Sequence, residues 1–150
     1  MPSPERPVLS GGRAGAIFIA KPPASVKRLL MATTDNCCTI VPYFEVPPDK
    51  LEQFKSIAER CVESTRSESG CLYYGFSFNG NVAHCREGYA DGESARAHLE
   101  NIAPLLQEAL AIAKLTRLEV HGPAEELAKL REPMAQLKPQ FFVLECGFRR

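Results

Sequence analysis

Several side chains that could perform acid–base chemistry occur within a short stretch of the sequence. Four of them alternate along two apolar runs: Tyr74, Cys85, Glu87 and Tyr89. His98 follows on the apolar stripe of the next predicted helix. An imidazole near a carboxylate can serve as a general base, because the carboxylate fixes its tautomer and raises its basicity. We therefore predict that His98 and Glu87 form a catalytic pair that deprotonates a phenol or an enolisable carbonyl compound.

The two apolar runs predict a β-hairpin, because Asn79-Gly80 between alternating apolar residues is a strong signal for a two-residue type I′ turn. With these two residues as the loop, Tyr74 is opposite Cys85, and Glu87 lies on the same face of the hairpin. The side chains of this face are otherwise mainly apolar. A carboxylate there is either paired or functional, because burying it unpaired costs free energy.

The remaining candidates on this face have more than one interpretation. Tyr74 and Tyr89 could orient a substrate through their hydroxyl groups, and Tyr43 on the first predicted strand could join them. Cys85 could contact a substrate or act as a nucleophile, but free cysteine is more typical of core packing. His98 and Glu87 could also be a structural pair that holds helix to sheet.

The pattern of apolar residues along the chain predicts one α+β domain that holds these side chains. Apolar periodicity indicates strands over 38–46, the two hairpin runs, 115–121 and 141–148, and helices over 49–65, 91–110 and 124–137. This is the ferredoxin-like split βαβ order with an appended helix and strand. Pro42 predicts an edge position or a bulge in the first strand, and Pro104 predicts a kink or break in the second helix.

One face of the predicted sheet has no helix to cover it. Its residues, among them Tyr73 and Val82, are too apolar for open solvent. Sheet-to-sheet association of two copies is the simplest cover, so we predict a homodimer.

The composition excludes several classes of partner. The 150 residues have a formal net charge of zero and no basic patch interleaved with aromatic residues, so a nucleic-acid partner is not expected. No apolar run reaches membrane-spanning length. The six cysteines have no zinc-type spacing and fall mainly in core patterns, which predicts a reduced cytoplasmic protein without a metal.

The first 36 residues differ in composition from the rest. They are rich in Pro, Gly, Ser, Ala and Arg and show little periodicity, so we predict that residues 1–36 are disordered and that the domain spans 37–150. The segment has the composition of an organelle transit peptide, or it is an over-extended start with Met31 as the initiator.

Five motifs within about residues 38–122 occur in a consistent order and spacing. They are Phe54, Thr65-Arg66, Glu68-Ser69-Gly70-Cys71-Leu72-Tyr73-Tyr74, Glu87-Gly88-Tyr89-Ala90-Asp91 and Ala97-His98-Leu99. With them the chain resembles the antibiotic biosynthesis monooxygenase family of dimeric α+β barrels. The resemblance implies a cofactor-free pocket between sheet and helices, and activities that include oxygenation of quinols, anthrones and other electron-rich phenolic rings.

The chain departs from part of that family. It contains no Trp, and His98 stands where haem-degrading relatives have Trp on the second helix. Haem degradation is therefore not expected. We predict a cofactor-independent monooxygenase that acts on a quinol-like or phenolic small molecule.

Two other functions remain open at this point. One is isomerisation or proton transfer on a small carbonyl compound in the same pocket. The other is a non-catalytic dimeric binding or stress-response module, in which replacing His98 changes stability alone. The resemblance also implies that the last strand, 141–148, packs on the partner copy.

Overall fold

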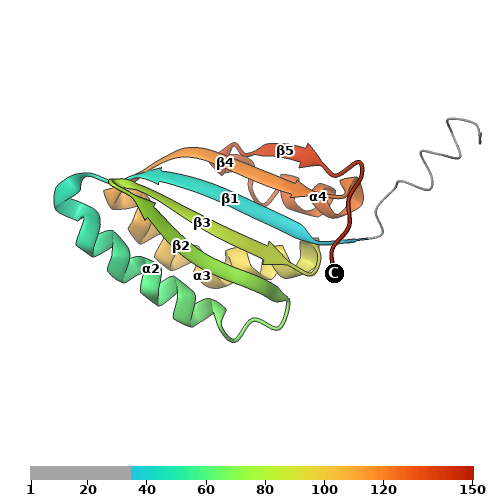
Figure 1. Cartoon of the computed structure of the whole chain (residues 1–150), viewed down its shortest axis with the longest axis horizontal. Helices are drawn as coiled ribbons and strands as arrows, with labels where there is room; N and C mark the ends of the chain where they lie inside the picture. Colours follow the sequence, from blue (N-terminus) through green and yellow to red (C-terminus); the bar gives the residue numbers. More distant parts are fainter. Residues whose placement is uncertain (1–34) are drawn as a thin grey trace, which may run out of the picture. The chain divides into compact units, whose positions relative to one another are not determined.

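The computed structural model describes residues 35–150 (Figure 1), and the expectations for the first 34 residues lie outside them. The elements are β1 (Cys38–Glu45), a 3₁₀ turn (Pro48–Lys50), α2 (Leu51–Thr65), β2 (Cys71–Asn79), β3 (Val82–Tyr89), α3 (Gly92–Ile112), β4 (Lys114–Gly122), α4 (Ala124–Arg131), a second 3₁₀ turn (Ala135–Leu137) and β5 (Gln140–Val143). No helix in this part of the chain is both long enough and apolar enough to cross a membrane.

The five strands form one sheet in the order β2-β3-β1-β4-β5. All neighbours are antiparallel except β4 and β5, which run parallel. Helices α2 and α3 lie side by side across one face of this sheet (Figure 1). The predicted α+β ferredoxin-like class is thereby confirmed.

The two long helices bury the apolar stripes that their sequences carry. Phe54, Ile57 and Cys61 are buried on α2 at i, i+3 and i+7. On α3, Ala95 and His98 follow the same spacing, and the helix begins at Asp91, whose carboxylate accepts a hydrogen bond from Ser94 N at 2.8 Å. This N-cap fixes the start of α3 and therefore which of its residues face the sheet.

The hairpin turn lies one residue later than the sequence predicts. Asn79 pairs with Val82, so Gly80 and the next residue form the turn, and Gly80 has a φ of 57°. A positive φ at the first central position alone is the pattern of a type II′ turn, not type I′. Tyr74 is therefore opposite Glu87 and not Cys85. The error is two residues in register, so from Tyr73 to Asn79 each side chain keeps the face that the alternation assigns to it. A register shift between Cys71 and Tyr73 interrupts this alternation at the start of β2, where Cys71 packs against the core and Leu72 is exposed.

Of the two alternatives predicted for Pro42, the structure has the bulge and not the edge position, and at Pro104 it has no break. Pro42 lies in β1, which is a central strand and not an edge, and the register of β1 against β4 shifts just beyond it, between Tyr43 and Phe44. Helix α3 continues through Pro104 without a break. Pro104 is exposed, while Ile102 is buried against the core, so packing holds the helix together where the proline removes a hydrogen bond.

The C-terminal strand is shorter than the sequence predicts, and its packing on a partner copy stays a prediction. Strand β5 ends at Val143 and pairs in parallel with β4 of the same chain, where it extends the sheet at one edge. The α4 helix ends at Arg131, two residues before Pro133; Glu132 still has right-handed helical backbone angles, and Pro133 has no N–H group with which to continue the hydrogen bonds of the helix.

Candidate functional site

A cavity lies between the sheet and helices α2 and α3. The centre of a water-sized molecule can occupy about 50 Å³ of it, within about 610 Å³ of empty space that includes open solvent. Most of the wall is apolar and includes Ile40, Phe44, Phe54, Ile57, Leu106 and Leu118. Four of the predicted site residues also line it: Tyr74, Cys85, Glu87 and His98. The cavity therefore suits a mainly apolar small molecule with few polar groups.

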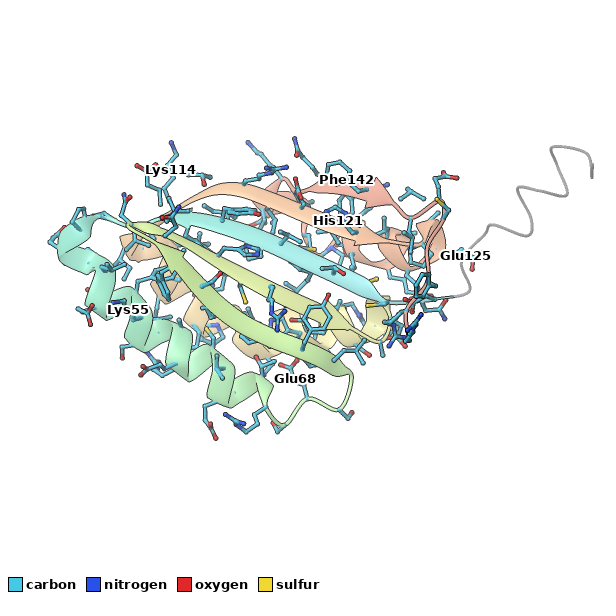
Figure 2. All side chains as sticks on the ribbon, in the orientation of Figure 1. Lys55, Glu68, Lys114, His121, Glu125 and Phe142 are labelled. Atoms are coloured by element: carbon cyan, nitrogen blue, oxygen red, sulfur yellow. The ribbon has the colours of Figure 1, made fainter. Side chains whose placement is uncertain are left out.

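His98 is fully buried, and its Nδ1 atom faces a carboxylate that the sequence did not single out. Nδ1 lies 3.0 Å from both Oε1 and Oε2 of Glu68. Glu68 belongs to the loop that joins α2 to β2 (Figure 2), and Asn101 of α3 donates a hydrogen bond to its Oε1 at 2.6 Å. An ionised carboxylate can only accept hydrogen bonds, so the Nδ1 atom that faces Glu68 carries a proton. In the neutral ring the free lone pair is therefore on Nε2.

The other ring nitrogen of His98 has no hydrogen bond, although it is buried. Nε2 lies 3.3 Å from Oε2 of Glu87, outside hydrogen-bonding geometry. Buried polar atoms almost always have a partner, because an unpaired one costs about 1–3 kcal/mol. An unpaired Nε2 in a residue that lines the cavity is therefore suited to accept a proton or a hydrogen bond from a bound molecule.

Glu87 is held by Tyr89 from the same face of β3. The Tyr89 hydroxyl donates to Oε2 of Glu87 at 2.5 Å. Burial, and then the nearby Glu87 carboxylate, raise the pKa of the Tyr89 phenol far above its usual value, so it stays protonated and remains a donor. The Tyr89 ring also packs against His98, with ring centroids 4.9 Å apart.

The other two groups at the cavity are neutral. Burial raises the pKa of the Cys85 thiol well above its usual value, which makes a reactive thiolate unfavourable there. Burial also raises the pKa of Tyr74, whose ring lies 5.2 Å from His98. Within residues 35–150, no three His, Cys, Asp or Glu side chains are grouped as metal ligands.

Two predicted substrate contacts are placed elsewhere. Tyr43 does not line the cavity; it lies on the opposite face of the sheet, stacked on His84 with ring centroids 4.4 Å apart. Its neighbours Pro42 and Phe44 line the cavity, and successive strand residues point to opposite faces. Tyr89 is fully buried and contacts the site through its bond to Glu87, without lining the cavity itself.

Glu68 is the residue at this site that sequence reasoning missed. It lies in a polar run after α2 that reads as an ordinary helix end, and it is 30 residues from His98. The one sequence feature that draws attention to Glu68 is the motif Glu68-Ser69-Gly70-Cys71-Leu72-Tyr73-Tyr74. Nothing in the local pattern shows that it contacts the histidine.

Comparisons with known proteins agree with this architecture. Residues 38–103 match the family described as antibiotic biosynthesis monooxygenase. The solved structure of MupZ from Pseudomonas fluorescens is 52% identical, covering 79% of this chain and 93% of its own, with a TM-score of 0.75. No curated protein matches the chain.

More distant solved structures share the fold alone. A conserved protein from Methanosarcina mazei Go1 is 21% identical, covering 57% of this chain and 91% of its own, with a TM-score of 0.55. A conserved protein of unknown function from Bacteroides thetaiotaomicron is 18% identical; the match covers 58% of this chain and 97% of that protein, with a TM-score of 0.53.

Proposed function

This chain belongs to the antibiotic biosynthesis monooxygenase family, and we propose that it is a cofactor-independent monooxygenase acting on a quinol-like or phenolic small molecule. The observation that carries the proposal is the Nε2 atom of His98, which is buried without a hydrogen bond in an apolar cavity. In this proposal His98 is the general base, and Glu87 stabilises its protonated form from 3.3 Å.

The cavity wall supports an uncharged aromatic substrate. Within the described part of the chain, no Lys or Arg lines the cavity, so an anionic group would find no positive partner there. An aromatic ring with one acidic hydroxyl suits both the apolar wall and the unpaired nitrogen of His98, because the ring contacts the wall and the hydroxyl reaches Nε2. The Tyr74 ring, beside the imidazole, offers a further surface for packing.

The chemistry needs no electrons from the protein. Nε2 removes the hydroxyl proton, and the resulting imidazolium lies between the carboxylates of Glu68 and Glu87. The electron-rich phenolate then reduces O₂. For a quinol with a free ring C–H, one oxygen atom enters the ring to give a hydroxyquinone and the other leaves as water, so the substrate supplies all the electrons.

The homodimer belongs to the same proposal. Tyr73 of β2 and Val82 of β3 are 38% and 39% exposed, and Tyr43 and His84 lie on the sheet face away from the helices. Association of two copies through this face would remove its apolar side chains from water. A cytoplasmic location also stays a prediction.

Proton transfer on a small carbonyl compound is the second candidate. It is favoured by the placement of carboxylates on both sides of His98, since these groups can move a proton without oxygen. This function predicts that an enolisable carbonyl compound exchanges its α-hydrogen with deuterated water under anaerobic conditions, whereas the monooxygenase requires O₂.

Oxygen uptake tests the proposal. We would measure it with a panel of hydroquinones, anthrones and simple phenols for the wild type, His98→Gln and the control His121→Gln. His121 stacks on Phe142, outside the cavity lining. We expect uptake above the buffer rate with the wild type and His121→Gln, and a loss on the order of 10²-fold or more in His98→Gln. The proposal fails if no compound consumes O₂ above background, or if His98→Gln is as active as the wild type.

A further inference from the structure

We infer that Glu68 is a positioning residue that also carries protons between the buried His98 imidazole and solvent. The purpose of this relay rests on the proposed function, because a fully buried base must release the proton that it takes up. The test of the relay does not depend on that function, since it needs no substrate.

The imidazole of His98 connects an inner carboxylate with an outer one. Nε2 lies 3.3 Å from Glu87, whose side chain is 6% exposed, and Nδ1 lies 3.0 Å from Glu68, whose side chain is 15% exposed. The His98 side chain itself has no exposed surface. An imidazole can accept a proton on one nitrogen and release another from the opposite nitrogen. Glu68 is therefore the group at which a proton from this ring can meet water.

Glu68 lies at the protein surface, where it can exchange a proton with water, and Glu87 lies in the interior. Glu68 lines a shallow surface depression together with Thr65, Arg66 and Tyr73. Figure 2 shows Glu68 at the loop after α2, at the edge of the molecule. Glu87 lines the internal cavity and is held by the buried Tyr89 hydroxyl. A proton leaving toward Glu87 would enter this mainly apolar cavity, whereas Glu68 lies at the outer surface.

Two polar side chains hold Glu68 in place against the ring. Asn101 donates to Glu68 Oε1 at 2.6 Å and to the Ser64 carbonyl oxygen at 3.3 Å, and the Ser64 hydroxyl donates to Asn101 Oδ1 at 3.1 Å. These bonds link the end of α2 to α3. They orient one carboxylate oxygen, so the carboxylate remains within 3.0 Å of Nδ1 while its edge reaches solvent.

The relay conserves protons and moves no electrons. As the substrate O–H bond breaks, an Nε2–H bond forms; the Nδ1–H bond then breaks, an O–H bond forms on Glu68, and water removes that proton. When the reduced oxygen atom leaves as water, Nε2–H returns its proton and solvent resupplies Nδ1 through Glu68. The neutral ring is thereby restored.

A proton relay through Glu68 and a purely structural role for Glu68 predict opposite changes in the rate at which the His98 Nδ1–H proton exchanges with water. The exchange rate of the His98 Nδ1–H proton with water can be followed by NMR in the ¹⁵N-labelled full chain. If Glu68 carries the proton, Glu68→Gln keeps an acceptor but loses the base, so exchange slows by about tenfold or more. If Glu68 only clamps the ring, the substitution loosens α3 and exchange becomes faster.

The control and a second variant complete the test. Glu63→Gln removes an exposed carboxylate at the end of α2 that pairs with Arg66, and it is expected to leave the exchange rate unchanged. Glu68→Asp keeps a carboxylate and is expected to exchange faster than Glu68→Gln. The inference is overturned if Glu68→Gln exchanges as fast as or faster than the wild type. A Glu68-dependent rate without any oxygen uptake would refute the proposed function and leave the relay standing.

Discussion

Replacing Tyr89 by Phe tests the arrangement around Glu87 with the removal of one oxygen atom. The phenol donates to Glu87 Oε2 at 2.5 Å, and both side chains are buried. The ring of Phe still fills the space and still packs against His98. The change therefore removes the hydrogen bond and little else.

The size of the effect follows from the loss of a donor to a buried acid. A hydrogen bond to a charged group is worth about 1.5–3 kcal/mol, and leaving the partner buried adds its desolvation penalty. We expect Tyr89→Phe to lower the free energy of unfolding by about 2–3 kcal/mol. For a domain of this size the midpoint of thermal unfolding would fall by roughly 6–12 °C.

Urea unfolding at neutral pH measures this difference, with Tyr43→Phe as a matched control. The Tyr43 ring stacks on His84 on the opposite face, a contact that Phe retains, so the control is expected to change stability by less than about 0.5 kcal/mol. A double-mutant cycle with Glu87→Gln should give a coupling energy of about 1 kcal/mol or more. A coupling energy of zero, or a Tyr89→Phe loss no larger than the control, would show that the Tyr89 hydroxyl does not stabilise Glu87.

Three further predictions concern stability. Glu126 accepts from Lys129 at 2.9 Å and from Gly92 N at 2.8 Å, and both bonds, the lysine's more strongly, lower its pKa. A pKa that is lower in the folded than in the unfolded protein stabilises the fold at pH values above the unfolded-state pKa. Glu126→Ala should therefore lower the free energy of unfolding by about 1–3 kcal/mol at pH 7. In urea titrations this difference between wild type and variant should shrink as the pH falls through the lowered pKa of Glu126. Pro104→Ala should raise stability by about 1–3 kcal/mol in thermal unfolding, because α3 already passes through this position unbroken; an unchanged melting temperature would contradict this. Gly80→Ala should cost about 1 kcal/mol in urea unfolding because φ is 57° there, and a neutral result would argue against a positive φ at this position.

The fold was predictable because its strongest signals are periodic. Alternation along the hairpin assigned Tyr74 and Glu87 to the cavity face even though the turn was misplaced, since a register error of two residues leaves the faces unchanged. Pro42 shows where local rules fail: the bulge was foreseen, but not that the strand is central, because strand order depends on long-range pairing.

The candidate site was predictable in part for the same reason. His98 and Glu87 fall on faces that periodicity defines, and the structure brings them within 3.3 Å. Glu68 comes from a loop, where no periodicity assigns a direction, and its contact with His98 depends on how α2 and α3 pack. Tyr43 was assigned to the cavity beside a proline whose effect on strand direction the sequence leaves open.

The ionisation state of a bound phenol shows whether His98 acts as the base. A phenol whose phenolate absorbs at its own wavelength, such as 4-nitrophenol, would be added to the wild type and to His98→Gln at a pH below its pKa in water. If His98 is the base, the phenol bound to the wild type will show the phenolate spectrum, and the phenol bound to His98→Gln will show the neutral spectrum. A neutral spectrum in the wild type, or equal phenolate in both proteins, would contradict the role of His98 as the base.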